Sequence, residues 1–137
     1  MNCEEDSILR LIKNLQDAIK RIVHGLDQLD IQQTRLEINK AFELFGKPTT
    51  FFYKTNFEEL IIFLNSKEDH HLNKVDLLAR LILINIKVDI SQKDNCQMLE
   101  KAKKLWEYYN EVSKEYSFER EENIYWIESL LKKSSSQ

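Results

Sequence analysis

The scarcity of glycine and proline constrains the fold of this chain more than any other feature of its sequence. Its 137 residues include two glycines, Gly25 and Gly46, and one proline, Pro48. Sandwiches, barrels and doubly wound folds need many turns in which a residue adopts a positive φ, and glycine usually fills those positions. Helices joined by short polar links need few such residues. The sequence therefore predicts an all-α fold.

The same scarcity excludes several catalytic and nucleotide-binding motifs. Glycines at positions 25 and 46 alone cannot form G-x-G-x-x-G, G-x-S-x-G or the G-x-x-x-x-G-K-[ST] phosphate loop. The adjacent His70 and His71 point about 100° apart on a helix and have no ligand one turn away, so we interpret them as part of a solvated loop. Acidic pairs such as Glu107 and Glu111 fall on predicted solvent-facing surface. We expect no catalytic residues, no metal site and no cofactor.

Length and composition fit one helical domain. The chain is 42% hydrophobic and 31% charged, which argues against disorder. We expect a single domain over residues 1–133 and a disordered tail at 134–137. Apolar runs such as Leu81–Ile84 are far shorter than the roughly 20 residues of a membrane span. The acidic stretch Glu4–Asp6 is the opposite of a signal peptide. We therefore expect a cytoplasmic protein with no membrane partner.

The charges of the chain are balanced and interleaved. Twenty Lys and Arg residues stand against 23 Asp and Glu residues, which gives a net charge of −3. A nucleic-acid-binding protein usually concentrates its Lys and Arg on one face. The pattern therefore argues against a nucleic-acid partner.

A long amphipathic helix is predicted near the start, over residues 7–29, with Ser7 as its N-cap. Apolar residues recur there at steps of three and four, which places them on one helical face. Four of them recur every seven residues, for about three heptads. Gly25 interrupts the helix, which fits either a close approach of another helix or a bend. The stripe consists of Ile8, Leu11, Ile12, Leu15, Ala18, Ile19, Ile22, Leu26 and Leu29.

The remainder of the chain is predicted to form antiparallel helical hairpins, for five to six helices in all. Gly46 and Pro48 end the second helix. Asn56 and Glu59 form a variant capping box for the third. Residues 51–53 are expected to form a connector or a helical turn, and 65–73 a polar loop. The predicted helices span residues 30–45, 57–64, 75–86, 91–116 or 94–116 (with Ser91 or Asp94 as the cap), and 117–133.

The segment 75–86 is apolar nearly all round, which is typical of the most buried helix of a domain. Residues Ile84–Ile90, however, alternate between apolar and polar with a period of two, which indicates a strand. We favour the helix because an isolated strand would leave its backbone unpaired. Where this helix ends between residues 84 and 90 is left open.

Aromatic residues gather near the predicted central and C-terminal helices. Most fit the core, and the remainder could line a groove, since Tyr and Trp suit interfaces. With polar groups such as Arg80 and Asn85, they could surround a pocket for a small ligand or a substrate. The candidate pocket residues are Arg80, Trp106, Tyr109 and Trp126.

Three phrases resemble a family of small bacterial all-helical proteins of unknown function. The first is Glu5-Asp6-x-Ile8-Leu9-Arg10-x-Ile12, and the second is Asn56-Phe57-Glu58-Glu59-Leu60-Ile61. The third, Ala102-x-x-Leu105-Trp106-x-Tyr108 followed by Phe118-x-Arg120, is similar to a tetratricopeptide-like hairpin. The resemblance implies a helical fold and supplies no activity. Residues 1–137 carry no second copy at the period of 34 that repeat arrays show.

We hypothesise that the chain is a non-enzymatic helical module that binds a protein partner or associates with itself, for example as a homodimer. The wide stripe of the first helix precedes an apparently complete core, so it could need a partner to cover it. The predicted partner-binding residues are Ile8, Leu11, Ile12, Leu15, Ile19, Ile22 and Leu26. A small-ligand-binding or enzymatic protein with the aromatic pocket is the alternative, and a nucleic-acid-binding regulator is a third.

Overall fold

The computed structural model describes the chain over residues 3–27, 31–88 and 95–135. Within these ranges it is all α, without a strand, as predicted. The described residues form seven helices where five or six were expected, because residues 49–54 form a helix of their own. The helices are α1 (Cys3–Asp27), α2 (Ile31–Leu44), α3 (Thr49–Lys54), α4 (Phe57–Phe63), α5 (His71–Val88), α6 (Asn95–Ser113) and α7 (Phe118–Ser135).

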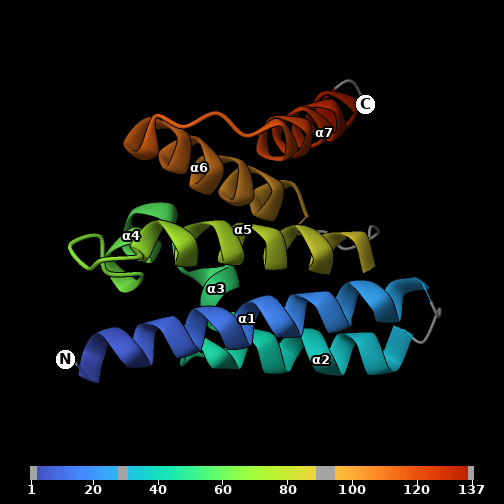
Figure 1. The fold of residues 1–137 in the computed structure, drawn as a ribbon. Helices are drawn as coiled ribbons and strands as arrows, with labels where there is room; N and C mark the ends of the chain where they lie inside the picture. Colours follow the sequence, from blue (N-terminus) through green and yellow to red (C-terminus); the bar gives the residue numbers. More distant parts are fainter. Residues whose placement is uncertain (1–2, 28–30, 89–94, 136–137) are drawn as a thin grey trace.

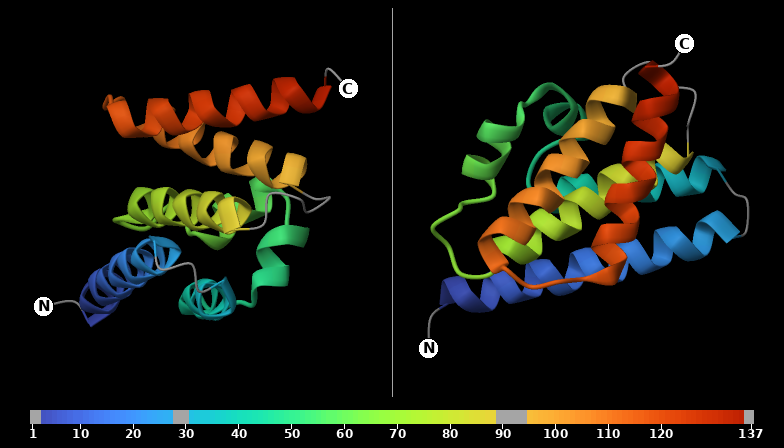
Figure 2. Two further views of the ribbon diagram at one scale, coloured as in Figure 1. Left: turned by 90° about the vertical axis from the view of Figure 1, so that its right-hand side faces the viewer. Right: turned by 90° about the horizontal axis from the view of Figure 1, so that it is seen from above.

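The helices are stacked in layers (Figure 1). The antiparallel pair α1 and α2 forms the bottom layer, and α5 lies across it with contacts to both. Helix α6 packs antiparallel on α5, and α7 packs on α6 as the top layer. The end-on view in Figure 2 shows the four levels one above the other, with α3 and α4 beside α5 and α6. The consecutive hairpins α1–α2 and α5–α6 confirm the predicted antiparallel packing.

Helix α5 is the centre of the core because it is covered from both sides. Its buried side chains point towards α1 and α2 as well as towards α6, which explains why its sequence is apolar nearly all round. The helix prediction for residues 75–86 is confirmed, and the helix continues to Val88. Asp89 and Ile90, the end of the alternating stretch, lie outside the described residues.

The short helix α3 is held by aromatic packing. Pro48 occupies its N-cap position with a φ of −71°, and Phe52 in its middle is fully buried. The ring of Phe52 lies 5.1 to 5.8 Å from four neighbouring rings, centroid to centroid. A six-residue helix is marginal by itself, so this tertiary cluster stabilises it. The four rings belong to Phe42, Phe45, Phe51 and Phe63.

The capping predictions have mixed outcomes. Asn56 Oδ1 accepts the backbone N–H of Glu59 at 2.8 Å, and Ser117 Oγ accepts that of Arg120 at 3.3 Å, so both predicted helix starts are confirmed. Ser7 is not an N-cap, because α1 already begins at Cys3. Helix α7 continues to Ser135, so residues 134–135 are helical rather than part of a disordered tail.

Gly25 allows a close approach of α1 and α2. A Cβ atom added to Gly25 would lie 3.3 Å from Oγ1 of the buried Thr34 on α2. Of the two explanations that the sequence leaves open for this glycine, a close helix approach or a bend, the structure supports the first. Gly46, which follows α2, has a φ of +101° and lets the chain turn towards α3.

None of the helices in the described ranges combines the length and the apolar character needed to cross a membrane.

Candidate functional site

The apolar stripe of α1 is part of the molecule's own core. Ile12, Leu15, Ile19 and Ile22 are 0–8% exposed, because α2 and α5 pack on this face. Ile8, Leu11 and Leu26 are partly buried against the same core, and Leu29 lies outside the described residues. The premise that this stripe lacks a cover within the monomer is therefore wrong. In this conformation the buried part of the stripe leaves no surface for a partner.

The four predicted pocket residues do not surround one cavity. Trp106 is fully buried and donates its indole N–H to Asp76 Oδ1 at 2.9 Å. Tyr109 carries the Arg120 guanidinium over its ring, 4.2 Å from the centroid, and lines a hollow beside the loop before α5. Trp126 lines a different hollow between α5 and α7. Asn85, the other proposed polar group, bonds to the Tyr53 hydroxyl.

Arg80 is engaged in a polar network that joins three helices. Its guanidinium donates to Asp76 Oδ2 at 3.0 Å and pairs with Glu119 Oε1 of α7 at 2.8 Å. Burial lowers the pKa of Arg80, but the charges and hydrogen bonds of Asp76 and Glu119 outweigh it, so the net shift is upward. Arg80 is thus a positively charged tie between α5 and α7. These two acidic partners account for an arginine at position 80, and no ligand is needed to explain it.

His71 is not part of a solvated loop, as the sequence suggested. It begins α5, and its ring is half-buried. Nδ1 lies 3.2 Å from the carbonyl oxygen of Glu68, and Nε2 lies 3.1 Å from the Tyr108 hydroxyl on α6. A Nδ1–H donor and a Nε2 acceptor satisfy both contacts, since a neutral imidazole has one of each. The ring therefore ties the start of α5 to α6.

Lys101 closes the end of α3 from α6. Its ammonium donates to the carbonyl oxygens of Phe52 and Tyr53 at 2.8 and 3.1 Å. These carbonyls belong to the last turn of α3, where backbone acceptors lack helical partners. Burial lowers the pKa of Lys101. Its contacts are with the backbone of its own chain, so we assign it a structural role.

One surface feature that the fold leaves unexplained is the side of α7 that faces away from α6. Arg120, Ile124 and Ile127 are buried beneath the helix. On the opposite side, Phe118 is 66% exposed and Tyr125 is 74% exposed. We call this side the outward face of α7. At helical spacing it comprises Phe118, Glu122, Tyr125, Ser129 and Lys132.

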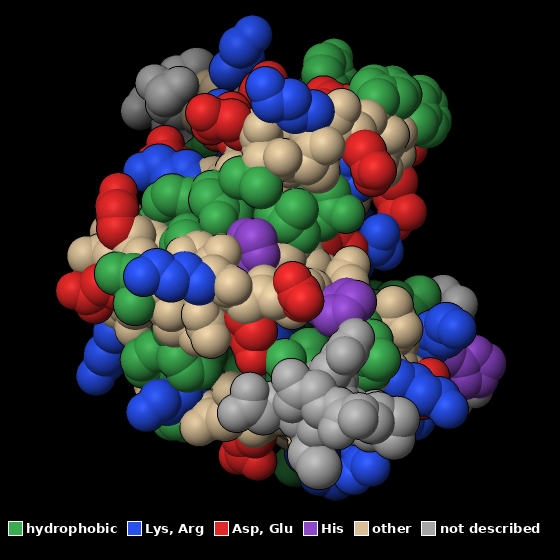
Figure 3. Space-filling view, turned by 60° about the vertical axis from the view of Figure 1, so that its left-hand side comes forward, with side chains coloured by type: hydrophobic (Ala, Val, Ile, Leu, Met, Phe, Trp, Pro, Cys, Tyr) green, Lys and Arg blue, Asp and Glu red, His purple; other side chains and the backbone are tan. Residues whose placement is uncertain are grey.

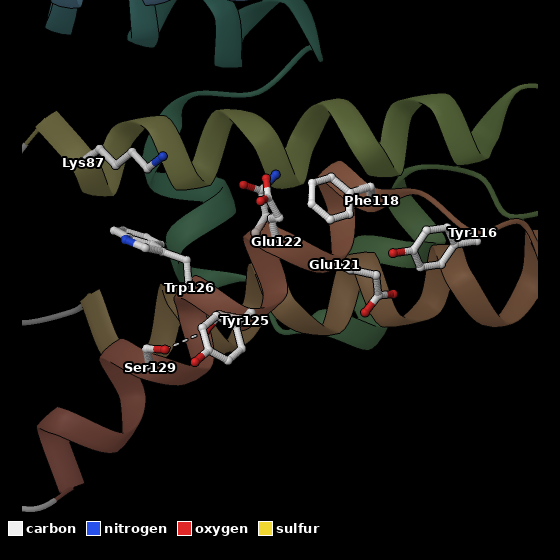
Figure 4. Close-up of a pocket in the computed structure, with 9 residues that line it drawn as sticks. Lys87, Tyr116, Phe118, Glu121, Glu122, Tyr125, Trp126 and Ser129 are labelled. Atoms are coloured by element: carbon white, nitrogen blue, oxygen red, sulfur yellow. Dashed lines mark hydrogen bonds between the residues drawn. The ribbon is translucent and has the colours of Figure 1, made fainter.

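An open hollow of about 510 Å³ lies along this face. In Figure 4, Lys87 extends from α5 towards Trp126 of α7, and its Nζ lies 5.0 Å from the centroid of the indole ring. Glu122 and Phe118 follow along α7, while the Tyr125 ring points away from Lys87. Tyr116, in the link before α7, is 76% exposed at the end of the hollow. The lining is thus aromatic and acidic with one lysine.

Charge is segregated along α7. Glu119 and Glu121 lie in its first turn with Glu122 directly after them, whereas Lys132 and Lys133 lie in its last turn. Acidic groups at the start and basic groups at the end complement the helix dipole. They also give the outward face one negative end and one positive end, with Tyr125 and Ser129 between them.

The rest of the described surface has no cluster of metal ligands, and the face drawn in Figure 3 has no basic patch. Among the described residues, no three His, Cys, Asp or Glu side chains are grouped as metal ligands. Figure 3 shows Lys, Arg, Asp and Glu side chains interspersed over the face it presents. That face therefore offers no concentration of positive charge for a nucleic acid.

The sequence carries a signal for the outward face of α7. Ile124 and Ile127, three residues apart on the helix, are both buried. With those two inward, a period of 3.6 places Phe118 and Tyr125 on the opposite side. The large aromatics were instead assigned mostly to the core. Phe118 and Tyr125 are exposed on this side instead of lying in the core.

Comparisons with known protein families, with curated proteins and with solved structures found no match for this chain.

Proposed function

We propose that this chain is a non-enzymatic helical module that binds a protein partner through the outward face of α7. The observation that carries the proposal is the exposure of Phe118 and Tyr125, 66% and 74%, on the side of α7 opposite to its buried face. Exposed aromatic side chains are favoured anchors of protein interfaces because they bury a large area at low cost in conformational entropy.

The position of α7 in the stack strengthens this argument. The successive antiparallel helices α5, α6 and α7 are consistent with tetratricopeptide-like packing in the C-terminal half, which we include in the proposal. In helical stacks, the terminal element needs a polar outer face to remain soluble alone. Helix α7 carries Phe118 and Tyr125 on that face instead. A partner that covers these two side chains would remove their apolar surface from water.

A ligand pocket has less support. The four aromatic and basic residues proposed for it are divided between a buried network and two separate hollows. The hollow along α7 is open, whereas small-molecule sites usually enclose most of the ligand surface. A groove of this shape fits the side of another protein better.

Site-specific photocrosslinking tests the proposal. Tyr125 is replaced with benzoylphenylalanine, and Ile62 on α4, which is equally exposed at 74%, is replaced in a matched control. Both variants are irradiated in cells that express the chain. We expect protein adducts from position 125 and none from position 62. An excess of the wild-type chain should compete for these adducts, and an excess of the F118D/Y125D double variant should not. Equal adducts from both positions, or none from position 125, would refute the proposal.

A further inference from the structure

We infer that the occupant of the outward face of α7 is a second copy of this chain, paired through an antiparallel contact of α7 with α7. The inference rests on the proposed function, since it names the partner of the same face. The motivating observation is the sign of charge along the helix, negative at Glu121 and Glu122 and positive at Lys132 and Lys133. A face that is negative at one end and positive at the other is complementary in charge to a second copy of itself that runs in the opposite direction.

The register follows from the spacing of these charges. Glu122 and Lys132 are ten residues apart, or about 15 Å along a helix with a rise of 1.5 Å per residue. A two-fold axis level with residue 127 would place Glu122 of each copy level with Lys132 of the other, across the shared outward face. The same axis would bring the exposed Tyr125 rings within about 6 Å of each other along the helix direction. The charges and the Tyr125 ring thus agree on one register, in which Phe118, the first residue of α7, lies at the end of the contact.

The alternative arrangement of two such helices is disfavoured by the same charges. A parallel pair would place the acidic ends together and the basic ends together, and like charges across an interface oppose association. Antiparallel pairing about a two-fold axis also gives a closed dimer in which both copies contribute the same residues to the contact. The charge pattern therefore selects a closed, isologous dimer and opposes a parallel pair.

The expected dimer is weak. Helix α7 has 18 residues, which corresponds to a length of about 27 Å. A contact along one such helix falls short of the roughly 800 Å² per partner of a standard stable interface. We therefore expect dissociation in the micromolar range. Because the flanking charge pairs are exposed, the dimer should weaken as salt is added.

The helix dipole offers a competing explanation for the same charges, because it also favours glutamate at the start of α7 and lysine at its end. That explanation requires no partner. The two explanations differ when variants are mixed: a dipole penalty lies within each chain and remains after mixing, whereas a mismatch between two chains is relieved by a chain with the opposite change.

The experiment is sedimentation velocity on the purified full chain at concentrations from about 10 to 300 µM, a range that spans a micromolar dissociation constant. The wild type should show a reversible monomer–dimer equilibrium. The E122K and K132E variants should each dimerise about tenfold more weakly, since each reverses two exposed ion pairs per dimer. An equimolar mixture of the two should regain dimerisation to within about threefold of the wild type.

A matched control separates this contact from general attraction between oppositely charged proteins. K20E changes an exposed lysine of α1 and gives the same net charge as K132E. K20E keeps the wild-type α7 and should dimerise as the wild type does, whereas a labelled E122K chain should pair with K20E more weakly than with K132E, because one of the two charge pairs stays mismatched. The Y125A variant, in which a side chain that is 74% exposed is truncated, should remain folded by circular dichroism and should lose dimerisation. It keeps the test decisive if either charge variant fails to fold.

Each outcome decides between the two proposals. A monomeric wild type over the whole range refutes the pairing of two copies. If position 125 still crosslinks to another protein, the proposed function stands with a different partner. A dimer that Y125A leaves unchanged, or that mixing fails to restore, refutes the antiparallel α7 contact. A monomer without crosslinks at position 125 refutes both proposals.

Discussion

Asp76 should contribute more to stability than an exposed acidic residue, because it satisfies a donor in the core. Trp106 is fully buried, and its indole N–H has Asp76 Oδ1 as its acceptor at 2.9 Å. Asp76→Ala would leave that donor unpaired, at a cost of about 1–3 kcal/mol. Loss of the Arg80 pair, one turn away on α5, adds about 0.3–0.5 kcal/mol. We expect a total loss of about 1.3–3.5 kcal/mol in the free energy of unfolding, with about 2 kcal/mol as the central value.

Asp76→Asn is the matched variant. The asparagine side chain keeps an acceptor oxygen for Trp106, but it presents an amide N–H₂ where Arg80 needs an acceptor. The charge pair is lost and the buried indole remains satisfied. We therefore expect a loss of only about 1 kcal/mol. The difference between the two losses in unfolding free energy measures the cost of leaving the buried indole N–H without an acceptor.

Urea denaturation followed by circular dichroism at the helical band measures these changes. With a slope of about 2 kcal/mol per molar urea, Asp76→Ala should lower the midpoint by about 1 M, and Asp76→Asn by about half of that. A double-mutant cycle with Trp106→Phe should give a coupling energy of about 1–2 kcal/mol between the two residues. Equal losses for alanine and asparagine, or a coupling energy near zero, would refute the assignment.

Three further predictions concern the fold. Leu15→Ala, in the covered stripe of α1, should cost about 2–5 kcal/mol, whereas Leu9→Ala on the exposed side should cost less than about 0.5 kcal/mol; similar losses in thermal unfolding would contradict the burial of the stripe. Gly25→Ala should be nearly neutral in the wild type, because the helix-propensity gain of about 1 kcal/mol opposes the tight contact with Thr34, and should become stabilising in a Thr34→Ala background. Lys101→Met should destabilise the chain by about 1–2 kcal/mol at neutral pH. Because the folded pKa of Lys101 is lowered, the unfolded chain holds more protons in the alkaline range below the ordinary lysine pKa of about 10.4, so stability of the wild type relative to Lys101→Met should rise with pH there. A flat or falling difference in denaturation midpoints would refute that assignment.

The arrangement of helices could be predicted from local signals because those signals and the tertiary packing agree. Gly46 with Pro48 ends α2, Asn56 caps α4, and the apolar segment before Val88 forms the central helix. Each is a short-range preference that the fold reinforces. Helix α3 was expected only as a connector or a helical turn over residues 51–53, because six residues have little helical preference of their own. Its stability comes from rings that are distant in the sequence.

The candidate site was harder to predict because exposure depends on which helix covers which face. The stripe of α1 has the pattern of an association surface, yet α2 and α5 cover it. Conversely, Tyr125 has a large aromatic side chain of the kind expected in the core, and it is exposed. Periodicity gives the direction of a side chain on its own helix. Periodicity does not show whether another helix covers that side chain. Exposure is therefore hardest to predict for the last helix of a stack, which has a neighbour on one side only.

The attachment of α7 to the stack has a consequence for dynamics. Its backbone packs mainly against α6, and its links to α5 are side-chain contacts through Arg80 and Lys87. Opening α7 would therefore leave α1 to α5 intact, so this helix can act as a separate cooperative unit. Amide hydrogens of α7 should exchange with solvent through this sub-global opening, while those of α5 should exchange only on global unfolding. Anything that binds the outward face of α7 would then reveal itself as slower amide exchange in the top layer, without a matching change in the bottom layer.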